Sequence, residues 1–370
     1  MCFLAPSGSE NADVRDADRA WIHQAIARIE ADYNRSADTH LIKVDLPIPG
    51  IHLYLKDESS HPTGSLKHRL ARSLMLYALC NGRVGPRTTL IEASSGSTAV
   101  SEAYFARLIG SRFIAVVPRS TSSEKVRMIE DQGGEVFFVD GPKEVYGAAE
   151  RLAAETGGYY LDQFTFAERA TDWRGNNNIA ESLFRQMSAE PAPVPSWLVC
   201  SAGTGGTSAT LGRYIRYRRF DTRLCVADPE SSVFHRHFVD PSVMELDCPG
   251  PGIEGIGRPR VEPSFLPELV DCMIAVPNAA SLAAMRAISD VIRKPCGGST
   301  GTNIWATARI ISRMMARGET GSVVTLLCDS GDRYRSTYYD ETWIATQGLD
   351  LAAARAEIDD FLLKGVPLSE

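Results

Sequence analysis

The sequence predicts an α/β protein in which parallel or mixed sheets are covered by helices. From residue 51 onward, short apolar segments typical of buried strands alternate with longer amphipathic segments of helical spacing. Such alternation indicates parallel strands connected by helices, and a chain of 370 residues has room for two sheets. The expected strands are 51–57, 88–92, 112–117, 135–139, 196–200, 223–227, 271–276 and 322–328, and the expected helices are 17–32, 66–81, 98–109, 121–132, 142–156, 176–188, 207–219, 279–294, 300–316 and 350–364.

Two blocks of this alternation define the expected domains. A smaller α/β domain is expected over residues 51–170, and a larger α/β domain over residues 17–50 and 171–345. Residues 346–370 are expected to form a C-terminal helical tail. The segment 229–268 is rich in proline and glycine and lacks periodicity, which predicts long loops.

The composition argues against several classes of partner. The net charge is −7 and no basic run occurs, so neither nucleic acid nor a membrane is expected to bind. The N-terminus lacks the basic and apolar regions of a secretory signal, and the eight scattered cysteines form no Cys-x-x-Cys pair. A cytoplasmic protein with buried, reduced thiols is therefore expected. No metal is expected, because His235 and His237 have no cluster of cysteines or carboxylates beside them in the sequence.

A lysine at a predicted strand-to-helix junction is the first candidate for chemistry. The segment Pro62-Thr-Gly-Ser-Leu-Lys67-His-Arg69 places Lys67 after a glycine-containing turn, at the start of the helix 66–81 and after the strand 51–57. In α/β proteins, ligands bind beyond the carboxyl ends of the strands, where such junctions lie. The alternative for Lys67 is an ordinary surface lysine.

A glycine-rich loop far along the chain is the second candidate. The segment Ser201-Ala-Gly-Thr-Gly-Gly-Thr-Ser208 follows an apolar strand and precedes a helix, so its amides and hydroxyls can converge on a phosphate at a helix N-terminus. A dinucleotide site is the alternative, since Asp228 follows the next strand, but the third glycine of that pattern would fall at Ser208. A fixed amine together with a phosphate cradle is what pyridoxal 5'-phosphate requires. The cradle comprises Gly203, Thr204, Gly205, Gly206 and Thr207.

The lysine segment, with Lys56-Asp-Glu before it, resembles the lysine motif of fold-type-II pyridoxal-phosphate enzymes. Within them it is similar to the cysteine synthase / cystathionine β-synthase group, over about residues 40–335. The resemblance implies two α/β domains with the cofactor in the cleft between them, Lys67 at the interface, and a homodimer. The other matching segments are Ser94–Thr98 (substrate-carboxylate loop, smaller domain), Gly203–Thr207 (phosphate loop, larger domain), Ile253–Gly257 (gating segment), Cys296–Gly301 and Ser330–Tyr334 (closing motif).

The resemblance also implies roles for individual residues. Lys67 would form the Schiff base with the cofactor and take the Cα proton of the substrate, and Ser299 would face the pyridine nitrogen with a neutral hydroxyl. For Ser299 and for the carboxylate loop the alternative is a helix cap, and for Gln163 it is a polar residue at a strand end. The expected cofactor-binding residues are Lys67, Ser97, Gly203, Thr204, Gly205, Gly206, Thr207 and Ser299, and the expected substrate-binding residues are Ser94, Ser95, Gly96, Thr98, Gln163 and Gly255.

Two departures from the usual family pattern point to one branch of it. Ser97 stands where the family usually has asparagine, and His68 where it usually has aspartate. Together with Ser95–Glu102 and Glu254–Pro263, they resemble bacterial L-cysteine desulfhydrases. This implies β-elimination on L-cysteine, giving hydrogen sulfide, ammonia and pyruvate. The alternatives are β-replacement, as in cysteine synthase using O-acetylserine and sulfide or in cystathionine β-synthase, and a non-catalytic scaffold.

Overall fold

The computed structural model describes residues 9–35, 38–247 and 252–369 of the chain, which form two compact units. Unit 1 comprises residues 9–35 and 70–163, and unit 2 comprises the other described residues, from 38 to 69 and from 164 onward. Each unit contains one sheet with helices packed against it.

Unit 2 is built on a six-stranded sheet in the order β1-β2-β10-β7-β8-β9. Only β1 runs antiparallel to its neighbour, and all other neighbouring strands are parallel. The central strands are nearly continuous apolar runs, as expected of parallel strands that are buried on both faces. The strands are β1 (His40–Val44), β2 (Ile51–Asp57), β7 (Trp197–Ser201), β8 (Arg223–Pro229), β9 (Cys272–Val276) and β10 (Gly321–Leu327).

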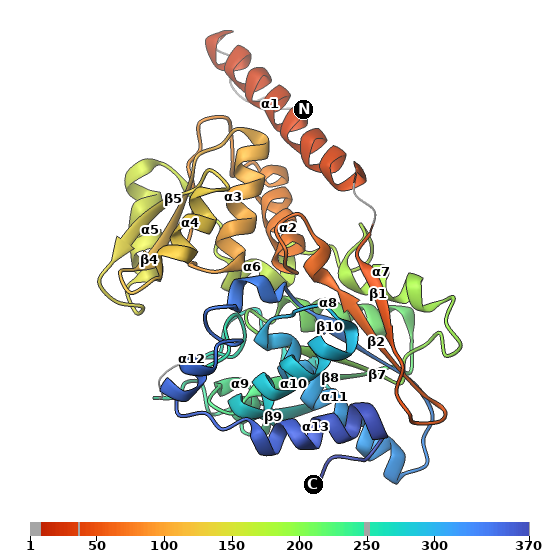
Figure 1. Cartoon of the computed structure of the whole chain (residues 1–370). Helices are drawn as coiled ribbons and strands as arrows, with labels where there is room; N and C mark the ends of the chain where they lie inside the picture. The colour runs from red at the N-terminus through yellow and green to blue at the C-terminus, as the bar shows by residue number, and fades with distance from the viewer. Residues whose placement is uncertain (1–8, 36–37, 248–251, 370) are drawn as a thin grey trace. The chain divides into compact units, whose positions relative to one another are not determined.

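The helices of unit 2 form two hydrophobic cores with this sheet. Side chains of β10 alternate between the cores, with Val323 and Leu327 in one and Val324 and Leu326 in the other, because successive side chains of a strand point to opposite faces. Helices α10 (Asn278–Ile292), α11 (Gly298–Ala316) and α13 (Ala352–Lys364) pack together in the first core (Figure 1). Helices α7 (Ile179–Met187), α8 (Gly206–Arg218) and α9 (Val233–Val239) supply residues to the second.

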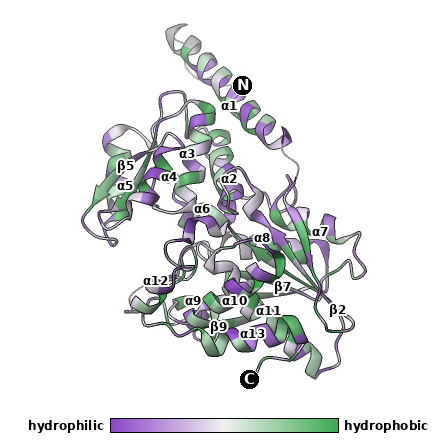
Figure 2. Cartoon of the chain, in the orientation of Figure 1, coloured by the Kyte–Doolittle hydropathy of each residue, from purple (hydrophilic) through white to green (hydrophobic). Residues whose placement is uncertain are grey.

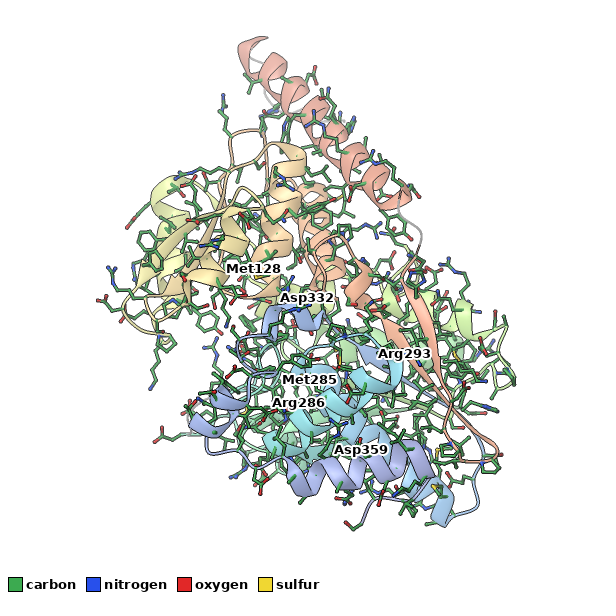
Figure 3. The ribbon with its side chains drawn as sticks, in the orientation of Figure 1. Met128, Met285, Arg286, Arg293, Asp332 and Asp359 are labelled. Atoms are coloured by element: carbon green, nitrogen blue, oxygen red, sulfur yellow. The ribbon has the colours of Figure 1, made fainter. Side chains whose placement is uncertain are left out.

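Along these helices, side chains buried in the core are followed directly by side chains at the surface. Helix α13 carries both hydrophobic and hydrophilic residues, and buries Ile358 and Phe361 (Figure 2). On α10, Met285 is fully buried, whereas the adjacent Arg286 donates to the carbonyl of Tyr338 at 3.0 and 2.9 Å (Figure 3). Amphipathic spacing therefore positions these helices on the sheet.

Unit 1 is built on a four-stranded parallel sheet in the order β5-β4-β3-β6. Helix α5 (Val145–Thr156) presents Ala148 and Ala149 to Ile91, Ile114 and Val116 of the sheet. The strands are β3 (Leu90–Glu92), β4 (Phe113–Pro118), β5 (Glu135–Val139) and β6 (Tyr159–Tyr160), and the other helices are α1 (Ser9–Arg35), α2 (Lys67–Cys80, which begins in unit 2), α3 (Ser97–Ile109) and α4 (Ser123–Glu130).

The structure confirms every expected strand and helix to within a few residues, except that α1 starts earlier than residue 17. It adds short elements whose patterns are too brief to detect, and α9 lies in the segment expected to contain only loops. The added elements are β1, β6, α9, α6 (Gln163–Ala170) and α12 (Glu341–Thr346). Among the described helices, none combines the length and the apolar character needed to cross a lipid bilayer.

The expected domain boundaries are wrong at three places. Residues 51–69 belong to unit 2, because β2 pairs with β1 and with β10. The helix at 17–35 belongs to unit 1, because α1 packs against α3. Residues 164–170 belong to unit 2, where Phe164 accepts a hydrogen bond from the amide of Ser264. Strand pairing and helix packing between distant segments therefore decide these boundaries.

The cysteines form no disulfide within the part of the chain that the structure describes. Four of them are buried, as expected, whereas Cys80 is exposed and Cys272 is half-buried. Cys2 and Cys248 lie outside the described residues. The buried cysteines are Cys200, Cys225, Cys296 and Cys328.

Candidate active site

The turn that carries Lys67 is fixed to the carboxyl end of β10 in unit 2. Ser65 forms an isolated antiparallel bridge with Asp329, and the amide of Leu66 donates to the carbonyl of Cys328 at 2.8 Å. The Ser65 hydroxyl in turn accepts from the amide of Lys67 at 3.2 Å, where α2 begins. Lys67 therefore stands at a strand-to-helix junction, as predicted.

The surroundings of Lys67 favour an amine that gives up its proton. Its side chain is densely surrounded by protein atoms although part of its surface is exposed, and burial lowers its pKa below the ordinary value. Arg258 lowers this pKa further, whereas Cys328 and Asp329 raise it. A larger fraction of neutral amine at neutral pH suits both a nucleophile and a general base.

The glycine-rich loop connects β7 to α8 in unit 2. Gly205 caps α8 in the left-handed region with a φ of 92°, and the Thr204 hydroxyl accepts from the amide of Gly206 at 3.2 Å. Thr207 lies in the first turn of α8. The first amides of a helix lack partners within that helix and lie at the positive end of its dipole, so this loop suits a phosphate dianion.

Close contacts explain why the loop consists of glycines. A Cβ atom on Gly203 would lie 2.2 Å from the carbonyl oxygen of Gly255, and one on Gly205 would lie 2.5 Å from the carbonyl oxygen of Ser264. The phosphate loop thus packs directly against the predicted gating segment. Gly255 itself has a φ of 83°, and a Cβ there would meet no atom within 4 Å.

Ser299 belongs to the same region of unit 2 as Lys67. Gly297 caps α11, so Ser299 is the second residue of the helix and the N-cap alternative is wrong. Ser299 lies beside the thiol of Cys328. Burial raises the pKa of this thiol to about 12, and Ser299 and Lys67 act in the opposite direction without reversing the shift. Cys328 therefore links the predicted pyridine-facing serine to the predicted Schiff-base lysine.

Asp329, directly after β10, is a buried acid that the sequence analysis missed. Its Oδ2 accepts from the Tyr334 hydroxyl at 2.6 Å, whereas its buried Oδ1 has no hydrogen-bond partner among the residues that the structure describes. Burial raises the pKa of Asp329 to about 6, and Lys67 acts in the opposite direction. In the same closing motif, Asp332 lies at the exposed turn after β10 (Figure 3). The sequence signal was an acidic residue at the carboxyl end of an apolar strand.

His68, one of the two departures from the family pattern, has a structural role in unit 2. It is buried, its Nδ1 lies 3.2 Å from the Thr63 hydroxyl, and its ring stacks on His61 with centroids 5.0 Å apart. The adjacent Arg69 donates from Nε to Glu58 at 2.6 Å. These contacts hold the first turn of α2, and with it Lys67.

The predicted carboxylate loop lies in unit 1, between β3 and α3. Gly96 is the N-cap residue of α3, without a side-chain hydrogen bond, and the helix begins at Ser97, so this segment does cap a helix, as the alternative expected. The Ser94 hydroxyl accepts from the amide of Gly96 at 3.3 Å. The amides of the first turn of α3, together with these hydroxyls, suit a carboxylate.

Gln163 is joined to this loop within unit 1. The Thr98 hydroxyl donates to Oε1 of Gln163 at 2.7 Å, and both side chains are buried. Gln163 is the first residue of α6 and not the end of a strand. Ser95 is half-buried. The structure thus groups the predicted substrate residues of unit 1, and separately groups the predicted cofactor residues of unit 2.

The residues of unit 2 fit pyridoxal phosphate. A densely surrounded lysine, a glycine loop with no room for a Cβ atom and a serine beside the same cysteine are the donor set that an aldehyde, a phosphate and a pyridine nitrogen require. Lys67 would hold the aldehyde carbon, the 203–207 loop the phosphate and Ser299 the ring nitrogen.

Comparison with known proteins identifies relatives in sequence and in fold. L-cysteine desulfhydrase Cds1 of Mycobacterium tuberculosis is 58% identical over 96% of this chain and 98% of the relative. A putative cysteine synthase of Sinorhizobium fredii is 29% identical over 88% of this chain and 94% of the relative. The crystal structure of O-ureido-L-serine synthase, 24% identical, matches 83% of this chain and 96% of its own with a TM-score of 0.71, which confirms the expected fold. A family model described as pyridoxal-phosphate dependent enzyme matches residues 36–329, and the chain belongs to that family.

Proposed function

We propose that this protein catalyses β-elimination on L-cysteine, in which L-cysteine and water become hydrogen sulfide, ammonia and pyruvate. The observation that carries this proposal is the 58% identity, over nearly the full length of both chains, to a protein named L-cysteine desulfhydrase. A cytoplasmic homodimer is part of the proposal and rests on the family resemblance and on the composition.

The residues of the two units are assigned complementary tasks. Bound pyridoxal phosphate supplies the electron sink that stabilises negative charge at Cα. Lys67, with its lowered pKa, removes the Cα proton, and the thiolate then leaves from Cβ. The 203–207 loop binds the cofactor phosphate, and Ser299 gives the ring nitrogen a neutral partner. Ser97 is assigned a contact with the cofactor.

The substrate carboxylate is assigned to the loop at the N-terminus of α3. Ser94, Ser95, Gly96 and Thr98 supply hydroxyls and amides there, and Gln163 is joined to Thr98. Gly255 is assigned to the substrate side of the gating segment, because no described atom lies within 4 Å of where its Cβ would be.

The experiment that tests the proposal measures sulfide and pyruvate released by the holoenzyme from L-cysteine alone. Equal amounts of both, without a second substrate, are expected, and Lys67→Ala should reduce the rate at least about a thousandfold because it removes the base and the covalent anchor. The replacement alternative is favoured by the likeness to a putative cysteine synthase. Turnover that requires added sulfide with O-acetylserine, or added homocysteine with serine, would replace the lyase assignment with that alternative.

A further inference from the structure

Two fully buried glutamates lie directly behind the predicted carboxylate loop of unit 1. Glu92 is the last residue of β3, and Glu102 lies on α3. The Glu92 carboxyl accepts from the amide of Ala93 at 2.8 Å through Oε1 and from the amide of Gln163 at 3.1 Å through Oε2. Glu92 thus positions the backbone on both sides of the site, just before Ser94 and at Gln163.

Glu102 has a different environment. Neither of its two buried carboxyl oxygens has a hydrogen-bond partner in the described part of the chain, and Glu92 is the neighbouring acid that raises the pKa of Glu102. A fully buried carboxylate without a donor, beside a second acid, is strongly disfavoured, so Glu102 keeps its proton and can direct it toward Glu92. Since Glu92 already accepts two amide hydrogens, Glu102 is the member that donates.

The charges around the pair favour keeping this proton. Burial is the largest cause that raises the pKa of both carboxyls, and for Glu102 the charge of Glu92 is the second. Asp162 raises the pKa of Glu92 as well, and the half-buried Tyr160 has its own pKa raised by burial and by both glutamates. No lysine, arginine or histidine among the described residues forms an ion pair with either glutamate.

These contacts close a ring around the carboxylate loop. Thr98 and Glu102 are four residues apart on α3, so they lie on one face of the helix. Thr98 donates to the side chain of Gln163, and the amide of Gln163 donates to Glu92. A protonated Glu102 completes the ring by donating to Glu92. The shared proton therefore joins the helix that carries the loop to the strand that precedes it.

We propose that Glu92 and Glu102 are positioning residues for the substrate carboxylate, and that the single proton they share holds Thr98 and Gln163 in the geometry that binds it. The inference rests on the proposed function, because that proposal assigns the carboxylate to this loop. Loss of the proton at alkaline pH places two negative charges side by side, separates α3 from β3 and weakens substrate binding.

Two isosteric variants separate this role from mere packing. The proposal predicts that KM of the unmodified enzyme rises at alkaline pH. Glu102→Gln keeps a donor toward Glu92 at every pH, so this rise should be absent from the variant while kcat stays within about threefold. Glu92→Gln places an amide group against one of the two backbone N–H donors, so KM should rise at least about tenfold at neutral pH. Packing alone predicts equal, pH-independent effects of the two variants, and that result would overturn the proposal. An alkaline rise in KM that persists unchanged in Glu102→Gln would do so too.

Two readouts do not depend on sulfide release. Infrared difference spectra of the holoenzyme should show a protonated-carboxyl band that persists above pH 7 and is lost in Glu102→Gln; absence of the band in the unmodified protein contradicts the shared proton. Calorimetric binding of L-alanine, which has no β leaving group, should weaken with rising pH in the unmodified protein and not in Glu102→Gln. If both results hold while no sulfide or pyruvate is released, the reaction is wrong and the positioning role stands. L-alanine binding that does not weaken with pH overturns that role.

Discussion

Two buried glutamates, Glu58 in unit 2 and Glu102 in unit 1, are held in opposite ways. In unit 2, Glu58 accepts from Nε of Arg69 at 2.6 Å and lies 3.0 Å from Nε2 of His61. In unit 1, the carboxyl oxygens of Glu102 have no hydrogen-bond partner among the described residues, and its acidic neighbour is Glu92. Burial alone raises the pKa of each, yet Arg69 and His61 bring the pKa of Glu58 well below its ordinary value, whereas Glu92 raises that of Glu102 further.

The comparison shows that the partner, and not the degree of burial, decides the charge of a buried acid. Because Arg69 compensates its charge, Glu58 stays ionised around neutral pH, and the contacts that hold the turn before Lys67 do not change their charge there. In the proposal, the proton shared by Glu92 and Glu102 is lost at alkaline pH, so the contacts that hold the carboxylate loop do change their charge.

Removing Arg69, the cation that pairs with Glu58 in unit 2, should cause the largest loss of stability. Arg69→Ala leaves Glu58 buried without a charged donor from α2, and such losses cost about 3–5 kcal/mol. The free energy of unfolding, measured by urea titration at fixed cofactor concentration, should fall by about that amount.

A matched control lies on the same network. Arg69 and Arg185 both bond Asp38, at 3.1 and 2.6 Å, but the Arg185 side chain is 59% exposed and that of Arg69 is 14% exposed. Arg185→Ala should therefore cost less than about 1 kcal/mol. Equal losses in the two variants would show that the burial of the Arg69–Glu58 pair contributes nothing to stability.

Glycines of the two loops provide the second test. Gly203→Ala would bring a Cβ to 2.2 Å from the backbone of Gly255, so the phosphate loop must move, and affinity for pyridoxal phosphate should fall at least about tenfold. Gly96→Ala meets no atom within 4 Å, so cofactor affinity should be unchanged while KM rises, because the new methyl group occupies space assigned to the substrate. Cofactor titration and substrate kinetics measure both. Unchanged affinity in Gly203→Ala would contradict the assignment of this loop to the phosphate.

Local patterns were enough to predict most helices and strands. The roles of the candidate site residues came from the family resemblance and stay predictions. Periodicity located β2 and α2 on either side of Lys67, because both patterns depend on neighbouring residues alone. The domain of β2 could not be predicted in this way. Its partner β10 lies far along the chain, and pairing between distant strands leaves no local signal.

Buried charges were the other feature beyond reach of the sequence. Glu92 ends an apolar strand and Glu102 lies within an apolar helix, so each could be noticed as an acid in a core element. Their contact, however, depends on how α3 packs against β3. Asp329 follows β10 in the same way, and only the folded chain brings it to Ser65 and Lys67.

The smallest expected effect is on how stability depends on pH. The pair Glu92–Glu102 in unit 1 and Glu58 in unit 2 should contribute with opposite signs. Burial and the charge of Glu92 raise the pKa of Glu102 well above its ordinary value, so the folded protein holds on Glu102 a proton that the unfolded chain has released. Its stabilising effect is complete below the ordinary pKa and is lost as the pH rises toward the folded value, by at most about 1.4 kcal/mol per pH unit for each proton. Glu58 behaves oppositely, since its lowered pKa stabilises the fold above the ordinary value and this is lost only in acid.

Urea midpoints measured between about pH 5 and pH 8 should therefore fall more steeply in the unmodified protein than in Glu102→Gln, which carries no titrating group at this position. Glu58→Gln is the matched control from the other support. It should lower stability throughout this range without flattening the slope, because Glu58 is already ionised there. If Glu102→Gln leaves the slope of the urea midpoint against pH unchanged, the residues behind the carboxylate loop do not titrate in this range. They would then resemble the residues that hold the Lys67 turn.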